Sequence, residues 1–280
     1  MRPSIPYPRP VSLIDLQSHS TVSDGELPPE EVVEAAAGAG VTVLALTDHD
    51  AVAGVPAAEA AGERLGVEVI PAIEMSSANE LVDDLHICGY WIDPEKISPA
   101  CEKAQEGRVQ RAAAIIEKLR GFGLDVTLED AIREAGGADA IGRPHIARAA
   151  GASGDLGPFF EEYLVPGAKA FVAREWPSPA EACQVIRDAG GVPVIAHPYW
   201  DIKDPDEVEK LIRSLDLGGI EVFYPSHTRE EAARLLELAR DLGIAATAAS
   251  DFHGPDHRQF SRFGAYQTYG LGEPEIPPRP

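Results

Sequence analysis

The sequence is poor in cysteine and in long apolar runs. Its three cysteines are widely separated and form no CxxC pair, which argues against a disulfide framework and a thiolate metal site and favours a reducing compartment. The longest apolar runs have the length of strands, so no membrane-spanning helix is expected. The start MRPSIPYPRP lacks the apolar core of a secretory signal. A cytoplasmic location is therefore expected.

Basic residues are also scarce, since 24 Lys and Arg stand against 46 Asp and Glu, a formal net charge of −22. A long-range field of that sign repels nucleic acid and anionic lipid, so neither duplex DNA nor a membrane is an expected partner. No feature of the sequence indicates a protein partner. An anionic substrate requires a locally positive pocket made of metal ions or converging arginines, and the acidic surroundings favour a small substrate.

What the sequence does contain is an alternation of short apolar strands with Ala- and Glu-rich helices. It begins with SLIDL, PPEEVVEAAAGAG and VTVLAL and predicts seven strands in all. Such alternation requires a mostly parallel sheet flanked by helices, either open and doubly wound or closed as a barrel.

The alternation is interrupted once and divides the chain. It covers residues 11–97 and 170–270, whereas residues 98–169 predict helices only, with a break at about Ser98. We interpret 98–169 as an inserted all-helical subdomain. Residues 1–10 and 271–280 are rich in proline and predict irregular tails.

Five of the eight histidines lie at or beside predicted strand ends, together with three carboxylates. Reactive groups of parallel α/β barrels lie at the carboxyl ends of strands, so this set is expected to share one face. Imidazole and carboxylate suit divalent ions such as Mn, Fe or Zn, with Mg as a further option, and eight ligands exceed the need of one ion. The pattern predicts two or three divalent ions, held by His19, Asp24, His49, Glu74, His86, His197, Asp251 and His253.

The order of these residues resembles that of the PHP (polymerase and histidinol phosphatase) family of metal-dependent phosphoesterases. The chain has SDG after the first strand, TDH after the second, a lone Glu after the third, AHP after the fifth and SDFHG after the last. The resemblance implies a distorted (β/α)7 TIM-like barrel. Asp24 and the insertion before AHP are similar to one branch, the 3′,5′-nucleoside bisphosphate phosphatases and 5′-to-3′ exoribonucleases.

The resemblance also implies how the ligands are shared, with Glu74 bridging the first two of three ions. The other ligands then divide into three groups: His19 and Asp251, His86 and His197, and Asp24, His49 and His253. Where the family has the first His of His-x-His, this chain has Gln17, whose neutral amide oxygen is a poorer ligand. Either Gln17 binds the first ion through its oxygen, or that ion is weakly bound or absent. We favour an ion that is retained but weakened, because His19, Glu74 and Asp251 still supply three ligands.

Ions in such a cluster activate a water and neutralise phosphoryl oxygens, so the expected reaction is in-line attack by water without a side-chain nucleophile. His197, His253 and Asp251 are the expected catalytic residues. Either histidine is a candidate to protonate the leaving oxygen, and a metal-bound water is the alternative donor.

The helical insertion supplies candidate phosphate-binding groups. Arg108 and Arg111 share one helix face, and IGRPH places Arg143 and His145 at a helix start, where free N–H groups favour an anion. The resemblance implies that Arg143 and His145 bind a second phosphate of the substrate, as similar positions do in the related phosphatases. A solvated helix face is the alternative for the first pair. His227 follows the sixth strand and is expected at the same mouth, unless it lies only beside a helix cap.

The sequence therefore predicts a metal-dependent phosphoesterase with a small anionic substrate. The resemblance implies that it converts a 3′,5′-nucleoside bisphosphate to the 5′-monophosphate or acts at the 5′ end of a short oligoribonucleotide. The alternatives are a histidinol-phosphate phosphatase, and a degenerate barrel that binds nucleotide or metal without turnover because of Gln17. Trp91, Trp176 and Trp200 are candidates for stacking on a base, although packing is the simpler interpretation of each.

Overall fold

Seven strands form one sheet in the computed structural model, which describes residues 13–82, 84–136, 141–173 and 176–280. The expected tail at 1–10 lies outside these residues. The strands are neighbours in the order in which they follow along the chain: β1 (Leu13–Asp15), β2 (Val41–Leu46), β3 (Glu68–Ser77), β4 (Leu85–Tyr90), β5 (Val192–Ile195), β6 (Gly219–Phe223) and β7 (Ala245–Ala248). The prediction of a mostly parallel seven-stranded sheet is confirmed.

The exception to the parallel pattern is β4, which pairs antiparallel with both β3 and β5. Within the first of these pairs, His86 lies opposite Ser76. Because β4 runs in the opposite direction, its beginning lies at the edge where the parallel strands end. His86, the second residue of β4, therefore reaches the same edge as the residues that follow the parallel strands.

The loops that follow β1 and β7 are joined by hydrogen bonds. Leu16 N donates to Ala248 O (3.1 Å), and His19 N donates to Phe252 O (2.8 Å). Ser18 and Phe252 form a parallel bridge. The first and last motifs of the sequence are thereby brought side by side, although about 230 residues separate them along the chain.

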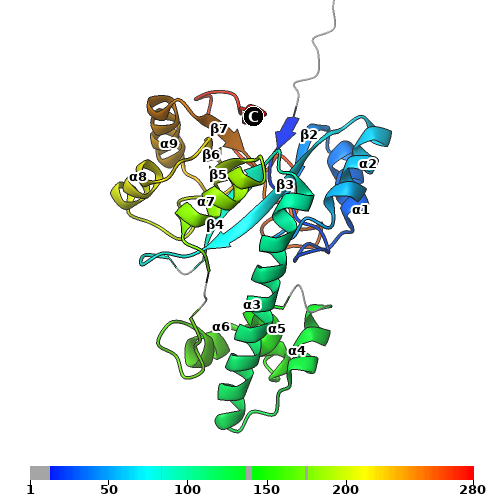
Figure 1. Cartoon of the computed structure of the whole chain (residues 1–280), viewed down its shortest axis with the longest axis vertical. Coiled ribbons are helices and arrows are strands. Elements are labelled where there is room, and N and C mark those ends of the chain that lie inside the picture. Colours follow the sequence, from blue (N-terminus) through cyan, green and yellow to red (C-terminus); the bar gives the residue numbers. More distant parts are fainter. Residues whose placement is uncertain (1–12, 83, 137–140, 174–175) are drawn as a thin grey trace, which may run out of the picture.

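Helices cover the outside of the sheet, α1 and α2 beside β2 and β3, and α7, α8 and α9 beside the later strands (Figure 1). Their starts and ends follow local signals that the sequence carries. Gly40, with φ of +85°, follows the end of α1, and Thr228 caps α9 in a capping box with Glu231. The bounds are α1 (Pro29–Gly38), α2 (Val55–Leu65), α7 (Pro179–Asp188), α8 (Pro205–Ser214) and α9 (Arg229–Leu242).

Between β4 and α7, the described residues form helices and no strand. The first helix begins at Pro94, four residues before the expected break, because Asp93 Oδ1 accepts a hydrogen bond from Glu95 N (3.1 Å) and caps it. The helices are α3 (Pro94–Gly121), α4 (Leu128–Ala135), α5 (Arg143–Ala149), α6 (Gly157–Phe159) and the π-helical turn η1 (Phe160–Leu164).

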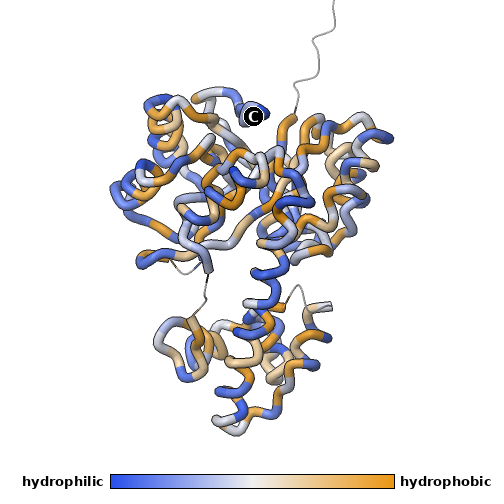
Figure 2. Tube along the Cα trace, in the orientation of Figure 1, coloured by the Kyte–Doolittle hydropathy of each residue, from blue (hydrophilic) through white to orange (hydrophobic). Residues whose placement is uncertain are grey.

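The long helix α3 takes part in two hydrophobic cores. Ile97 and Cys101, near its start, pack in the core beside the sheet. Ile115 and Leu119, near its end, pack in a second core with α4, α5 and η1. Figure 2 shows a mostly hydrophilic stretch of α3 between these two contacts. The helix therefore connects the sheet to a separately packed group of helices.

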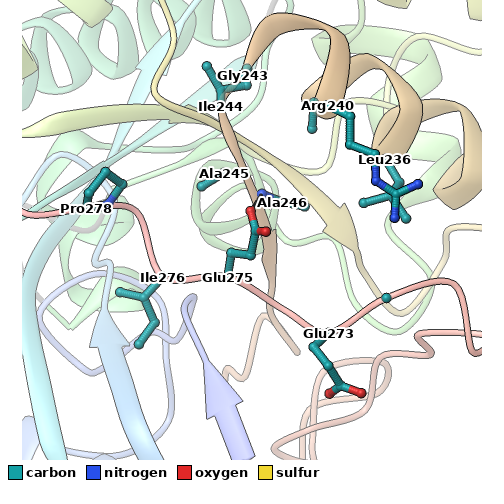
Figure 3. Close-up of a pocket in the computed structure, with 12 residues that line it drawn as sticks. Leu236, Arg240, Gly243, Ile244, Ala245, Ala246, Glu273, Glu275, Ile276 and Pro278 are labelled. Atoms are coloured by element: carbon teal, nitrogen blue, oxygen red, sulfur yellow. Dashed lines mark hydrogen bonds between the residues drawn. The ribbon is translucent and has the colours of Figure 1, made fainter.

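Residues 271–280 contain no helix or strand, and they are held against the sheet. Glu275 N donates to Ala246 O (2.8 Å), and Ala246 N donates to Glu275 Oε2 (3.0 Å). A pocket of about 580 Å³ lies between this segment, α9 and β7 (Figure 3). It borders the start of β7, whereas the SDFHG motif follows the end of that strand, so the pocket is remote from the histidines.

The three cysteines are free and buried. Burial raises the pKa of Cys101 and of Cys183 to about 12, so neither thiol is reactive near neutral pH. Among the described residues, no helix combines the length and the apolar character needed to cross a bilayer.

Candidate metal centre

The carboxylate of Glu74 lies at the centre of the histidine cluster. It is fully buried in β3, and its two oxygens face different neighbours. Oε1 lies 2.9 Å from His86 Nδ1 and 3.1 Å from His197 Nε2. Oε2 lies 3.1 Å from His19 Nε2 and 3.6 Å from His49 Nδ1. A single carboxylate therefore stands between two pairs of imidazoles, one pair at each oxygen.

A second group of ligand atoms gathers around Asp24, whose side chain is 47% exposed at the rim. Its carboxylate lies 3.5 Å from His253 Nε2 and 3.8 Å from His49 Nε2. Asp251 Oδ1 lies 3.1 Å from His19 Nε2 and 3.6 Å from His253 Nδ1, and so connects this rim to the buried centre. The structure thus brings together all eight residues that strand-end position singled out.

The cluster contains the unsatisfied polar atoms expected where a cation binds. Within the described residues, several buried atoms lack a hydrogen-bond partner, among them Gln17 Oε1, His19 Nε2, His86 Nδ1 and Asp251 Oδ1. Such atoms are costly to bury unless a partner or an ion satisfies them. Three sets of residues each offer ligand atoms within 4.8 Å of one another: His19, Asp24, His49 and His253; His49, Glu74 and His86; and His19, Glu74 and Asp251. The residues present therefore fit divalent cations.

The pKa shifts within the cluster also fit a site for cations. Burial favours the neutral form of His19, but Asp251 and Glu74 raise the pKa of this imidazole well above its usual value. Burial also opposes the ionised form of Glu74, yet His49 and His86 hold its pKa well below the usual range. For His49, burial prevails and lowers the pKa to about 4. Protons on some imidazoles therefore balance the carboxylates in the metal-free chain, and binding of cations must displace them.

Two residues of the cluster have backbones in the left-handed region, His197 with φ of +27° and Asp251 with φ of +57°. Such conformations cost of order 1–3 kcal/mol in residues other than glycine and persist where neighbours hold them. Glu221 Oε2 accepts from His197 N, and the Tyr224 hydroxyl donates to Asp251 Oδ2, both at 2.8 Å. The sequence analysis did not identify Glu221 or Tyr224. The one available signal was an acidic residue inside the apolar run GGIEVFY.

Gln17 faces the cluster through its amide nitrogen. Nε2 donates to Glu74 Oε2 at 2.8 Å, the oxygen that also faces His19. An N–H at this oxygen competes with a cation for the same lone pairs. Gln17 Oε1 is buried without a hydrogen-bond partner, so one end of the amide is bonded to Glu74 and the other is unsatisfied.

The two predicted substrate-binding arginines on α3 both contact residues outside that helix. Arg108 forms an ion pair with Asp50, and its guanidinium lies over the Trp176 ring, 5.4 Å from the ring centroid. Arg111 Nε donates to Val172 O (2.8 Å). Because Asp50 is the residue after His49, Arg108 connects α3 to the loop that carries a candidate ligand.

The other predicted substrate residues lie in two further places. Arg143 begins α5, as expected, with Nη1 3.5 Å from Leu164 O. His145, on the first turn of the same helix, accepts from Gly142 N through Nδ1 (3.1 Å). His227 is 2% exposed, and its Nδ1 donates to Val222 O (3.0 Å). It lies directly before the cap of α9 and is not open to the mouth; a role for it in substrate binding stays a prediction.

Comparison with known proteins agrees with this geometry. The family model described as "PHP domain" matches residues 15–163. A 3′,5′-nucleoside bisphosphate phosphatase of Chromobacterium violaceum is 35% identical over 250 residues, which are 86% of this chain and 87% of that protein. A 5′-3′ exoribonuclease of Haemophilus influenzae is 34% identical over 249 residues, which are 86% of this chain and 90% of that protein.

Solved structures extend the similarity to the fold. A structure from Bifidobacterium adolescentis, described as that of a candidate metal-dependent phosphoesterase, has a TM-score of 0.77 and 28% identity and covers 92% of each chain. More than half of the chain matches the family model, and the relatives match along most of its length. The resemblance seen in the sequence motifs is therefore confirmed, and the chain belongs to the PHP domain family.

Proposed function

We propose that the chain hydrolyses a phosphate ester of a small nucleotide, converting a 3′,5′-nucleoside bisphosphate to the 5′-monophosphate, or acts at the 5′ end of short oligoribonucleotides. The observation that carries the proposal is Glu74, whose two oxygens face separate pairs of imidazoles. A carboxylate so placed suits a site of two cations that clamp a phosphoryl group. The names of the two relatives support these substrates.

The ligands divide in this proposal as their distances suggest. Glu74 would contribute to the binding of a first and a second ion, and residues at the rim would hold a third. The remaining ligands are His19 and Asp251 for the first, His86 and His197 for the second, and Asp24, His49 and His253 for the third. Mn, Fe or Zn suits so many imidazoles better than Mg does. When bound, such ions activate a water and neutralise the phosphoryl oxygens.

Three side chains of the cluster serve the reaction itself. Asp251 is held by Tyr224, so that its Oδ1 faces the cluster. His197 and His253 are the candidates to protonate the leaving oxygen. In the metal-free chain burial opposes the charged form of His253, but Asp24 and Asp251 raise its pKa. His253 serves as the acid only where it does not also hold the third ion, because a coordinated imidazole has lost its proton.

The architecture of the site forms part of the proposal. We infer a distorted (β/α)7 barrel, built from 11–97 and 170–270, with 98–169 as a helical subdomain inserted into it. The hydrogen bonds between the loops after β1 and β7 support closure. The second core, to which α3, α4 and α5 contribute, supports a separate helical unit.

The acidity of the chain bears on the size and location of its substrate. A net charge of −22 repels long RNA outside the site, so it favours a mononucleotide or a short oligoribonucleotide. We propose that the protein is cytoplasmic and binds neither duplex DNA nor a membrane.

Arg143 and His145 are proposed to bind the second phosphate of a bisphosphate. We expect Arg143→Ala to raise KM for adenosine 3′,5′-bisphosphate about tenfold, the worth of one charge-assisted hydrogen bond. KM for adenosine 3′-monophosphate should change much less. Steady-state phosphate release measures both, with Arg148→Ala, an exposed residue of the same helix, as the matched control. Equal rises for both substrates would show that Arg143 does not bind the second phosphate.

Gln17→His is expected to strengthen the first ion site. The imidazole is a better ligand, and the substitution removes the amide N–H from Glu74 Oε2. The expected result is about one more ion per chain, or about a tenfold lower Mn²⁺ concentration at half-occupancy. Equilibrium dialysis with elemental analysis measures both, and Gln184→His, on the exposed face of α7, is the control. Unchanged stoichiometry and affinity would refute the weakened site.

The proposed function is tested by phosphate release from adenosine 3′,5′-bisphosphate. Release should occur with Mn²⁺, stop after chelation by EDTA, and return when Mn²⁺, Fe²⁺ or Zn²⁺ is restored. A 5′-phosphorylated pentaribonucleotide and histidinol phosphate, assayed in parallel, separate the exonuclease and histidinol-phosphatase alternatives.

One further outcome would favour a barrel that binds without turnover. The hydrogen bond from Gln17 to Glu74 supports this alternative, because it satisfies Glu74 Oε2 without a cation. Absence of hydrolysis with every ion, together with nucleotide binding in a calorimeter, would overturn the enzymatic proposal in its favour.

A further inference from the structure

The three tryptophans of the chain have different surroundings. Trp91 Nε1 donates to Pro277 O (2.8 Å), which ties it to the C-terminal segment. Trp176 lies beneath the guanidinium of Arg108. Trp200 is 38% exposed, more than either of the others. Of the three candidates for stacking on a base, Trp200 is therefore the most exposed.

The position of Trp200 is fixed by a residue of the candidate metal centre. Trp200 N donates to His197 O (2.7 Å), which closes a turn directly after that residue. The centroid of the indole lies 6.4 Å from that of the His197 ring, and the two planes meet at 69°. The indole therefore stands at the border of the cluster, within the length of a nucleotide from it.

Other aromatic rings support the indole from behind. Phe260, which is 8% exposed, lies 5.7 Å from the Trp200 ring and 5.6 Å from the His253 ring, between centroids. Tyr224, which is buried, lies 6.2 Å from Trp200 in an edge-to-face arrangement. Lys203 Nζ donates to Trp200 O (2.6 Å) and holds the turn. Packed rings of this kind leave the indole few alternative positions while part of it stays open.

We infer that Trp200 is the platform on which the nucleobase of the substrate stacks while the cluster binds the phosphate. This inference rests on the proposed function, since it requires a nucleotide. Stacking uses the flat face that every base has and contributes about 1–3 kcal/mol per base without reading its edges. The platform would thus select nucleotides over other phosphate esters of similar charge, with little preference among the four bases.

Trp200→Ala tests the inference with two substrates that differ only in the base. Adenosine 3′,5′-bisphosphate has the base, and 1,4-anhydroribitol 3,5-bisphosphate carries the same two phosphates on an abasic ring. We expect Trp200→Ala to raise KM for the adenosine compound at least about tenfold more than for the abasic one. Trp200→Phe keeps an aromatic face and should restore most of the difference.

Phe122→Ala is the matched control, because Phe122 is 54% exposed and lies at the end of α3; it should leave both KM values unchanged. Equal rises in both KM values, or no rise in either, would overturn the inference. Failure of the proposed function looks different, since the unchanged chain would then hydrolyse neither compound. In that case, calorimetric binding of the two compounds to the unchanged chain and to Trp200→Ala makes the same comparison and decides the role of Trp200.

Discussion

Glu74→Gln is expected to lower kcat/KM for adenosine 3′,5′-bisphosphate by about 10³-fold, which corresponds to the several kcal/mol that metal ions supply at a phosphoryl group. The amide keeps the shape of the side chain but removes its charge, and an amide NH₂ replaces one of the two oxygens. Each oxygen of Glu74 faces its own pair of imidazoles, so both buried ion sites should weaken together.

Elemental analysis and phosphate release measure the two effects of this substitution. Glu68→Gln is the matched control, because Glu68 is exposed at the start of the same strand. Thermal denaturation of the metal-free proteins shows whether the variant is folded. A folded Glu74→Gln protein that keeps its full metal content and rate would exclude Glu74 as the bridging ligand.

The cluster was predictable because its residues obey two local rules. Reactive side chains follow strands whose apolar runs can be read directly, and imidazole with carboxylate is a recognisable ligand set. His19, His49 and Asp251 were found in this way. His86 was found for a less direct reason: it lies at the start of its strand, and it reaches the cluster because β4 runs antiparallel to its neighbours. The direction of β4 was not apparent from its sequence.

The contacts that position the side chains of the site could not be predicted from the sequence, because they join elements that are distant along the chain. The ion pair between Arg108 and Asp50 joins residues 58 positions apart, and the direction in which α3 leaves the sheet determines it. A charged residue on a polar helix face suits solvent or substrate equally well in sequence. The bond from Tyr224 to Asp251 likewise depends on the neighbouring positions of β6 and β7.

The start of α3 is a further feature that the sequence did not predict correctly. The break in the alternation of strands and helices was expected at about Ser98. The helix instead begins at Pro94, where Asp93 provides a cap and proline suits the first turn. Its first turn then packs Ile97 in the core beside the sheet, which composition does not reveal.

Glu221 gives the second large prediction, because it holds the backbone of His197 in its left-handed conformation. Glu221→Ala removes that hydrogen bond and leaves a cavity, so the turn can relax and the imidazole can leave Glu74 Oε1. We expect kcat/KM to fall about 10–100-fold, the usual cost of losing a group that orients a metal ligand. Affinity for the second ion, measured by equilibrium dialysis, should fall with it.

Glu221→Gln separates this positioning role from a role of the charge. Burial, with Asp251 and Glu74 nearby, raises the pKa of Glu221 well above its usual value, which favours the neutral carboxyl group. The amide keeps a carbonyl oxygen that can accept from His197 N, and it should retain activity within about threefold. If the glutamine variant loses as much activity and metal affinity as the alanine variant, the hydrogen bond to His197 is not what Glu221 contributes. If the alanine variant keeps both, the strained turn at His197 holds without Glu221.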